Sequence, residues 1–199
     1  MIKLIFVGIL AYLMGSVTFG MIVPRLMGTS SDVRKMGSGN VGATNVLRTQ
    51  GKLQGGLVLA GDLLKGFLAS MVGLWIAGFT GGCVAGVCAM LGHCFPLYYG
   101  FKGGKGVATA AGVVLALFAK SMLILLPVFI LTILLSRMVS LGSLAGVTAL
   151  LLCLLLFRPP APMVFLSVFT AVMIVWKHKD NMKRILAGTE NKIWGKARE

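Results

Sequence analysis

The chain has 199 residues, of which 57% are hydrophobic and only 12% are charged, and its mean hydropathy is +0.93. These values exclude a disordered chain and argue against an ordinary soluble domain, because most of the apolar side chains would have no core to enter. The bilayer is therefore the expected solvent. The net charge of +14 fits cytoplasmic loops and an anionic substrate or lipid. It does not favour nucleic acid, because the basic residues are scattered between apolar segments.

Seven apolar segments follow one another, at about 4–24, 55–77, 80–97, 106–118, 121–136, 140–157 and 161–177. The stretch 106–136 decides how many membrane spans the chain has. A single helix of that length would measure about 45 Å, against a bilayer core of about 30 Å. A break at Lys120 and Ser121 is expected there. The two halves are short for full spans, so tilted and re-entrant arrangements both remain open. The first segment is interpreted as a retained transmembrane helix, because it lacks the cleavage site of a signal peptide.

Basic residues predict the orientation. With seven spans, one side of the membrane receives 25–53, 98–105, Arg137 and the tail from Lys177. That side carries 15 of the 19 Lys and Arg residues, against three on the other side: Lys3, Lys120 and Arg158. The side richer in basic residues faces the cytoplasm. We therefore predict an all-α integral membrane protein, a seven-transmembrane-helix bundle in one domain (1–199), with the N-terminus outside and the C-terminus cytoplasmic.

The first unusual polar segment reads GSGNVGATNVLR and runs from Gly37 to Arg48. Its glycines permit positive φ angles and a close approach to a ligand. Thr44, Asn45 and Arg48 are expected on the first turns of a short helix, whose N–H groups would bind phosphate well. The glycines also match a dinucleotide-binding pattern, but the preceding stretch 30–35 is polar and does not predict the required strand. The alternative is a flexible loop between helices.

The second segment reads GHCFP at 92–96 and FKGGKGVAT at 101–109, directly before an apolar helix. A lysine can neutralise a phosphate that the loop backbone surrounds, and such a charge-assisted hydrogen bond contributes roughly 1.5–3 kcal/mol. The segment is not a P-loop, because Gly106 stands where that motif needs Ser or Thr. The alternative is a glycine turn whose lysines only follow the positive-inside rule. His93 is expected to be a hydrogen-bonded structural residue.

The third segment is the tail from His178 to Glu190, HKDNMKRILAGTE. His178, Asn181 and Arg184 are three residues apart and would share one face of a helix. Imidazole, amide and guanidinium groups together suit an oxyanion or a polyol. The alternative is a solvated helix on an anionic membrane surface.

Smaller signals lie inside the apolar segments. Asp62 and Lys65 are three residues apart, and charges within a membrane are usually paired or functional, so an ion pair and a catalytic role are equally open. Ser140 and Ser143 begin the sixth segment, where helix capping and substrate contact are the two alternatives.

These segments resemble, in order and spacing, those of the bacterial acyl-phosphate:glycerol-3-phosphate acyltransferase family, known as PlsY. The runs GSGNVGATNVLR, GHCFP…FKGGKGVAT and HKDNMKRILAGTEN carry the resemblance, and D-x-x-K-G at 62–66 and R-x-x-SLGS at 137–143 also fit. The resemblance implies an enzyme of the bacterial inner membrane, with its active site near the cytoplasmic side. It would transfer a fatty acyl group from acyl phosphate to the 1-hydroxyl of sn-glycerol 3-phosphate, which yields lysophosphatidic acid and inorganic phosphate. That reaction is the first acylation step of phospholipid biosynthesis.

The resemblance also suggests roles for the residues. Lys105, His178 and Asn181 are the expected catalytic residues. Residues that would hold the acyl phosphate are Ser38, Gly39, Asn40, Gly42, Thr44, Asn45, Gly103, Gly104 and Gly106. Residues that would hold glycerol 3-phosphate are Arg48, Ser143, His178, Asn181 and Arg184. Asp62, Lys65 and Glu190 are expected to support the site.

Direct acyl transfer without a covalent acyl-enzyme is the expected mechanism, since acyl phosphate carries its own leaving group. His178 is the obvious base, Asp180 is a poorer one, and a substrate phosphate is the alternative proton acceptor. No metal or organic cofactor is implied, because neither a carboxylate cluster nor a His/Cys cage is present. Besides the two substrates and the bilayer, a soluble acyl-phosphate-forming enzyme is a candidate for transient contact.

Three other classes fit less well. A transporter for a phosphorylated metabolite predicts an internal repeat or polar groups on both faces. A CDP-alcohol transferase needs a set of metal-binding carboxylates, and the chain has only five Asp and Glu residues. A purely structural subunit gives no reason for three phosphate-suited segments on one side of the membrane.

Overall fold

The computed structural model describes residues 1–29 and 31–193 of the chain, and its regular elements are helices, with no strand among the described residues. Lys196 and Arg198, which the charge count includes, lie outside these residues. The chain divides into two compact units, unit 1 (Met1–Phe118) and unit 2 (Ala119–Glu199, described to residue 193).

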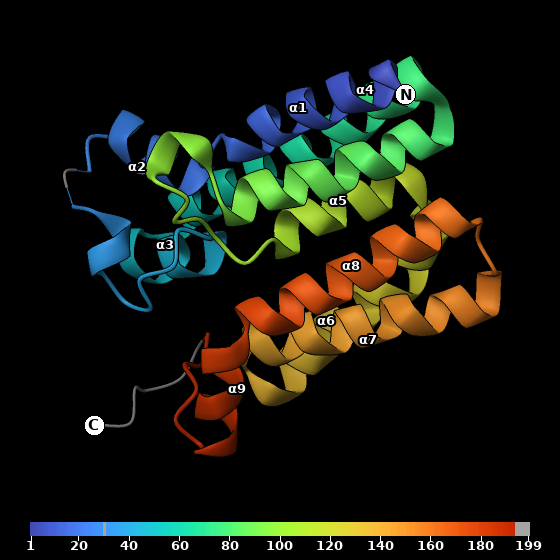
Figure 1. Ribbon diagram of the computed structural model, residues 1–199. Coiled ribbons are helices and arrows are strands. Elements are labelled where there is room, and N and C mark those ends of the chain that lie inside the picture. Colours follow the sequence, from blue (N-terminus) through green and yellow to red (C-terminus); the bar gives the residue numbers. More distant parts are fainter. Residues whose placement is uncertain (30, 194–199) are drawn as a thin grey trace. The chain divides into compact units, whose positions relative to one another are not determined.

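Unit 1 is built around one long helix. Helix α4 packs against both α1 and α5, and the three run side by side in Figure 1, with α2 and α3 at one end. The helices of unit 1 are α1 (Ile2–Ser16), α2 (Phe19–Leu26), α3 (Ala43–Gln50), α4 (Lys52–Cys94) and α5 (Val107–Leu117), with short 3-10 turns η1 (Val33–Lys35) and η2 (Leu97–Tyr99).

Helix α4 turns back on itself near its middle. Its 43 residues would measure about 65 Å if straight, more than twice the thickness of a bilayer core. Ala77 (φ −137°) and Gly78 (φ 67°) leave the helical conformation and divide α4 into two arms, 52–76 and 79–94. The two arms lie so close together that a Cβ atom on Gly73 would be only 2.5 Å from the carbonyl oxygen of Gly81. The predicted gap between segments 55–77 and 80–97 is therefore confirmed.

Glycines bring the helices of unit 1 into backbone contact. A Cβ atom on Gly15 of α1 would collide with the carbonyl of Ala89 in the second arm of α4. In the same way, a Cβ atom on Gly66 in the first arm would collide with the carbonyl of Thr109 in α5. Small residues at helix contacts are typical of membrane proteins, where they allow close van der Waals packing.

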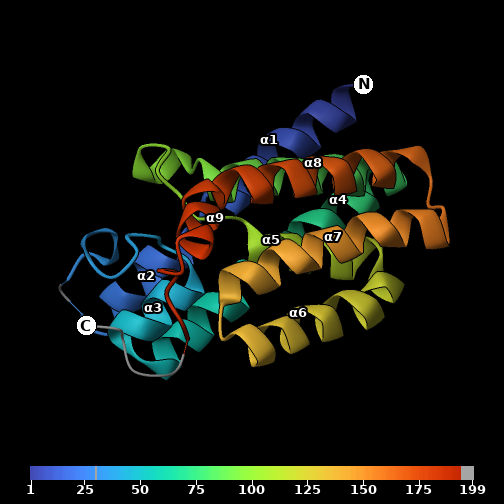
Figure 2. The same ribbon diagram turned by 90° about the horizontal axis from the view of Figure 1, so that it is seen from below.

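Unit 2 consists of antiparallel helices. α7 packs against α6 and α8, as Figure 2 shows from below. The elements are a 3-10 turn η3 (Ala119–Ser121), α6 (Met122–Ser136), α7 (Val139–Phe157), α8 (Ala161–Lys177) and α9 (Lys179–Leu186). Because α5 ends at Leu117 and α6 begins at Met122, the break predicted near Lys120 and Ser121 is confirmed.

All seven predicted segments are helical, but they differ in length. Within the described residues, three stretches are long and apolar enough to cross a membrane: Lys52–Tyr99, Ala119–Ser136 and Val139–Phe157. Two bent pairs, α1 with α2 (42°) and α8 with α9 (57°), raise the number to as many as five. The segment expected at 4–24 as one span is thus bent, because Val17 and Thr18 adopt extended backbone between α1 and α2.

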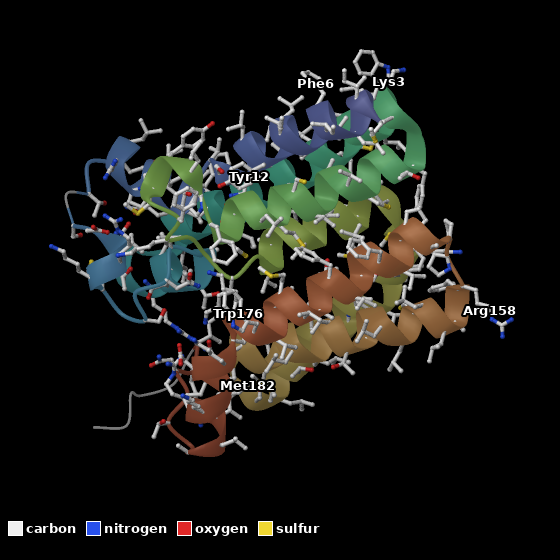
Figure 3. All side chains as sticks on the ribbon, in the orientation of Figure 1. Lys3, Phe6, Tyr12, Arg158, Trp176 and Met182 are labelled. Carbon is white, nitrogen blue, oxygen red and sulfur yellow. The ribbon has the colours of Figure 1, made fainter. Side chains whose placement is uncertain are left out.

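The two units each have a polar end. In unit 1, Lys3 lies near the start of α1, and nitrogen-bearing side chains gather around α2 and α3 at the other end (Figure 3). In unit 2, Arg158 lies at the turn between α7 and α8, and polar side chains gather around α9 (Figure 3). This distribution agrees with the predicted orientation, which stays a prediction.

Candidate active site

The loop before α3 is held by a single buried amide. Asn45 is 2% exposed, and its Oδ1 accepts a hydrogen bond from the backbone N–H of Ser38 at 2.9 Å. Its Nδ2 donates to the carbonyl oxygens of Met36 at 3.0 Å and Val33 at 3.2 Å. Both amide hydrogens of Asn45 are thus used inside the protein. This places Asn45 behind the loop as its anchor.

The short helix predicted after this loop is confirmed as α3, with Gly42 at its N-cap. The first N–H groups of a helix have no partner within it, so α3 presents donors beside the loop. Gly39 has a φ of +70°, a conformation that favours glycine. Ser38 and Gly39 are exposed, whereas Asn40 and Thr44 are half-buried. The loop therefore presents polar groups around the N-terminus of α3, which suits an anion.

The glycine-lysine loop before α5 lies directly against His93. The backbone N–H of Gly104 donates to the carbonyl oxygen of His93 at 3.1 Å. A Cβ atom on Gly104 would collide with Nε2 of the His93 ring, so only glycine fits there. Gly106 forms the N-cap of α5 with a φ of 84°. The half-buried Lys105 lies between these two constrained glycines, and its backbone position is fixed from both sides.

A buried charged cluster lies beneath this loop. Asp62, Lys65 and His93 are 1%, 5% and 3% exposed. Lys65 Nζ lies 2.7 Å from Asp62 Oδ1, and His93 Nδ1 lies 3.5 Å from the same oxygen. Lys65 also donates to the carbonyl oxygen of Val17 at 2.6 Å. The ion pair that the sequence left as one of two alternatives is therefore present.

In unit 2, Glu190 connects three other residues. Its Oε1 accepts hydrogen bonds from Ser140 Oγ at 2.8 Å and from Asn181 Nδ2 at 2.6 Å. Its Oε2 accepts from Arg184 Nε at 2.8 Å. Asn181 and Arg184 therefore share one face of α9, as their spacing predicted. The tail after α9 is tied by this one carboxylate to both α7 and α9.

The Glu190 carboxylate is charged in this environment. Burial raises its pKa, but the hydrogen bonds from Asn181, Ser140 and Arg184 and the charge of Arg184 outweigh burial. The pKa of Glu190 consequently lies below its ordinary value of 4.5.

His178 lies at the junction of α8 and α9 and is 3% exposed. Its Nδ1 lies 2.7 Å from the carbonyl oxygen of Ile174. Because a carbonyl oxygen only accepts, Nδ1 carries the hydrogen, and Nε2 is the nitrogen that can accept a proton in the neutral ring. This tautomer is inferred from the hydrogen bond.

The two serines at the start of α7 do not cap it. The N-cap is Met138, without a side-chain cap. Ser143 donates to the carbonyl oxygen of Val139 at 2.9 Å, and Ser140 donates to Glu190. The capping alternative is therefore wrong for both serines.

The structure groups the predicted residues by unit. Unit 1 holds all residues expected at the acyl phosphate together with Lys105 and Arg48. Unit 2 holds Ser143, His178, Asn181, Arg184 and Glu190. Sequence analysis named Ser140 and His93 but missed their partners. Ser140 bonds Glu190, 50 residues away, and His93 supports the backbone of Gly104 in the glycine-lysine loop.

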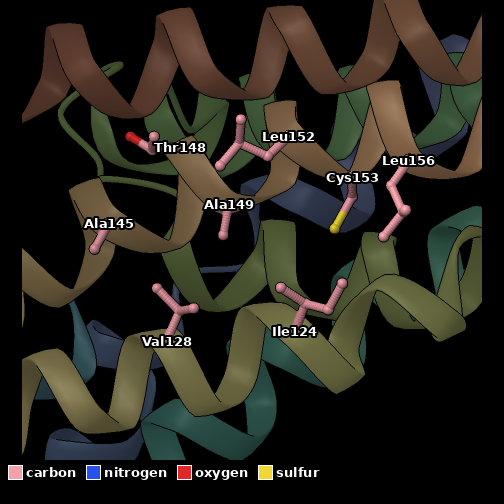
Figure 4. Close-up of a pocket in the computed structure, with 8 residues that line it drawn as sticks. All are labelled: Ile124, Val128, Ala145, Thr148, Ala149, Leu152, Cys153 and Leu156. Carbon is pink, nitrogen blue, oxygen red and sulfur yellow. The ribbon is translucent and has the colours of Figure 1, made fainter.

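Unit 2 also has an apolar hollow of ≈ 510 Å³ between α6 and α7. Figure 4 shows Ile124 and Val128 of α6 facing side chains of α7. The other lining residues are Ala145, Thr148, Ala149, Leu152, Cys153 and Leu156. No charged side chain lines this hollow, so it does not suit a phosphate.

Comparison with known proteins identifies a family. Residues 5–188 match the family model of glycerol-3-phosphate acyltransferases. A glycerol-3-phosphate acyltransferase of Pseudomonas putida (strain W619) is 47% identical over 184 residues, which cover 92% of this chain and 95% of that protein. One of Aquifex aeolicus (strain VF5) is 39% identical and covers 96% of this chain and 100% of that protein.

Two crystal structures of PlsY, an integral membrane glycerol 3-phosphate acyltransferase, are similar to the chain. The glycerol 3-phosphate form has a TM-score of 0.91 and 39% identity, and covers 96% of each chain. The lysophosphatidic acid form has a TM-score of 0.87 and 38% identity, and covers 95% of this chain and 94% of that one. The protein is thus a multi-pass membrane enzyme, and the chain belongs to the glycerol-3-phosphate acyltransferase family.

Proposed function

We propose that the chain transfers a fatty acyl group from acyl phosphate to the 1-hydroxyl of sn-glycerol 3-phosphate. The products are lysophosphatidic acid and inorganic phosphate, and the reaction is the first acylation step of bacterial phospholipid biosynthesis. The related crystal structures, in their glycerol 3-phosphate and lysophosphatidic acid forms, support this acceptor and this product. The observation that supports acyl phosphate as the donor is the loop that contains Lys105 and three glycines. This loop is held between His93 and the start of α5, and it can bind the phosphate of the donor.

The leaving phosphate is proposed to bind to unit 1. Lys105 supplies a positive charge, and the backbone N–H groups of its loop and of the α3 N-terminus supply donors. The polar side chains that contribute are Ser38, Asn40 and Thr44, beside the backbone of Gly39, Gly42, Gly103, Gly104 and Gly106. Asn45 keeps this loop in place from behind. Fixed donors of this kind stabilise the charge that develops on the leaving group.

Glycerol 3-phosphate is proposed to bind to the polar end of unit 2, and Arg48 stays a proposed ligand because the resemblance to the family assigns it that role. The residues of unit 2 that hold it are Ser143, His178, Asn181 and Arg184. Glu190 orients Asn181 and Arg184 through the hydrogen bonds described above. Held in this way, glycerol 3-phosphate keeps its 1-hydroxyl in a fixed orientation for attack.

The reaction needs no covalent acyl-enzyme. The 1-hydroxyl oxygen attacks the acyl carbon, an ester bond forms, and the bond between that carbon and the phosphate oxygen breaks. His178 Nε2 accepts the hydroxyl proton, which its hydrogen bond to Ile174 supports. A phosphate oxygen of the substrate is the alternative acceptor.

The setting of this reaction is the cytoplasmic side of the bacterial inner membrane. We propose seven spans with the N-terminus outside and the C-terminus inside, in a single domain. The basic residues around α2, α3 and α9 would then meet the soluble glycerol 3-phosphate, whereas the acyl chain stays in lipid. Transient contact with the enzyme that forms acyl phosphate fits the same basic face.

The donor is tested by offering two acyl donors separately. Purified enzyme in lipid vesicles receives labelled glycerol 3-phosphate with either palmitoyl phosphate or palmitoyl-CoA. We expect labelled lysophosphatidic acid from palmitoyl phosphate and none from palmitoyl-CoA. Product from the CoA donor alone would keep the family but overturn the donor.

A further inference from the structure

A buried charged cluster lies between the two glycine-rich loops of unit 1. It consists of Asp62 and Lys65 in the first arm of α4 and His93 in the second arm, all at most 5% exposed. Burying a carboxylate and an ammonium group costs free energy that their attraction does not fully return. Charged residues inside apolar helices are rare in membrane proteins, so this cluster is a natural place to look for a function.

One side of the cluster reaches the glycine-lysine loop. The Asp62 carboxylate faces Nδ1 of His93, which orients the ring. The opposite ring nitrogen, Nε2, lies against the Cα of Gly104, and the His93 carbonyl accepts the N–H of Gly104. A Cβ atom on the neighbouring Gly103 would collide with the same carbonyl. The ring and backbone of His93 thus form the surface on which the residue before Lys105 rests.

The other side of the cluster reaches the loop before α3. Lys65 bonds the carbonyl of Val17 at the break between α1 and α2, and its Nζ lies 5.9 Å from the centre of the Phe19 ring. Phe19 begins α2, whose next residue, Gly20, meets the carbonyl of Val41 so closely that no Cβ atom fits. Val41 belongs to the loop that contains Gly39 and Asn40. Lys65 thus fixes the helix break against which that loop packs.

We propose that Asp62, Lys65 and His93 are positioning residues that hold the two phosphate-binding loops of unit 1 at a fixed separation. The cluster itself does not touch the substrate. It acts through Gly104 on one side and through Val17 and Phe19 on the other. The proposal rests on the proposed function, in which both loops hold the phosphate of acyl phosphate.

The test separates positioning from simple stability. The neutral double variant Asp62→Asn/Lys65→Met removes both charges together, so that no uncompensated charge stays buried. A misplaced loop weakens substrate binding, and we expect the KM for acyl phosphate to rise by about tenfold or more, with the KM for glycerol 3-phosphate within about twofold. Steady-state kinetics with each substrate varied in turn measure both constants, and thermal unfolding in detergent checks the fold.

His93 offers a matched pair of variants. The amide nitrogen of asparagine overlays Nδ1 of histidine, whereas that of glutamine overlays Nε2. His93→Asn keeps a donor toward Asp62 and should retain more of the affinity for acyl phosphate than His93→Gln does. Ser70→Ala is the control, because Ser70 is fully buried in the same arm of α4 and is not one of the three residues of the cluster. Its two KM values should equal those of the parent protein.

Two results would overturn the proposal. The first is a double variant that is folded and has the parent KM for acyl phosphate. The second is a lower unfolding temperature with both KM values changed equally, which indicates a structural role only. Failure of the proposed function would look different, because the parent protein itself would then not use acyl phosphate.

Discussion

The side-chain oxygen of Asn45 and the backbone N–H of Ser38 lie 2.9 Å apart and form a hydrogen bond that closes the polar loop onto α3. The amide nitrogen of Asn45 donates two further hydrogen bonds, to the backbone carbonyl groups of Val33 and Met36 that precede the loop. The polar loop that the sequence singles out is thus tied to α3 by one buried side chain, which holds the backbone at Ser38.

Asn45→Ala tests this anchor. The variant leaves one N–H and two carbonyl groups without their partner, so we expect the free energy of unfolding to fall by about 1–3 kcal/mol and the KM for acyl phosphate to rise. Thr49→Ala is the control, since Thr49 only bonds the carbonyl of Asn45 within α3. Thermal unfolding and kinetics on both variants make the comparison, and equal effects of the two would contradict the anchoring role.

We expect the contribution of Glu190 to the stability of the folded protein to be lost in acid. Because its pKa in the folded protein lies below the ordinary value of 4.5, its contribution is fully present above that value and is lost as the pH falls through the folded pKa. Glu190→Gln should lower the unfolding temperature at neutral pH, and this difference from the parent protein should shrink as the pH falls below 4.5.

The matched control for Glu190 is Asp180→Asn, which changes the exposed carboxylate of α9. It should keep the pH dependence of the parent protein. An unfolding temperature of Glu190→Gln that parallels the parent at every pH would show that the carboxylate does not stabilise unit 2.

His178→Gln tests the proton acceptor. Glutamine can still donate a hydrogen bond but does not take up a proton near neutral pH. If imidazole is the base, we expect kcat to fall by about 10²–10⁴-fold. Single-turnover rates with saturating substrates measure this step, and Asp180→Asn should be unaffected. A rate within a few-fold of the parent enzyme in both His178→Gln and Asp180→Asn would assign the proton to a substrate phosphate.

The proposed orientation, with the N-terminus outside, predicts which introduced cysteines a membrane-impermeant thiol reagent labels in intact cells. Cysteine at position 3 or 158 should be labelled there, because Lys3 and Arg158 are assigned to the outer side. Cysteine at position 102 should be labelled only after the membrane is opened. The parent chain measures the background from its own four cysteines. Labelling of position 102 in intact cells would invert the topology.

Much of the fold was predictable because the bilayer simplifies it. Hydropathy located all seven helical segments, and helix length against bilayer thickness predicted the break near Lys120. The bend at Val17 and Thr18 was not predictable. Val17 and Thr18 are themselves neither proline nor glycine, and the partner that holds Val17 is Lys65, 48 residues away.

The site was predictable in its residue types more than in its contacts. The spacing of Asn181 and Arg184 predicted a shared face, but it did not indicate that Glu190 and Ser140 meet them there. Asn45 was expected on the ligand, whereas its amide is used by the loop itself. Contacts of this kind depend on how distant segments pack, which no local pattern encodes.

The central claim is direct acyl transfer with Lys105 at the leaving phosphate. The measurement is release of inorganic phosphate from palmitoyl phosphate by purified enzyme in lipid, with and without glycerol 3-phosphate. It is made on the parent enzyme, on Lys105→Ala and on Lys102→Ala, whose lysine is exposed in the same loop.

We expect release that requires glycerol 3-phosphate, equals the lysophosphatidic acid formed, persists in Lys102→Ala and falls by about 10²-fold or more in Lys105→Ala. Release at the same rate without glycerol 3-phosphate, or an unchanged rate in Lys105→Ala, would contradict the account.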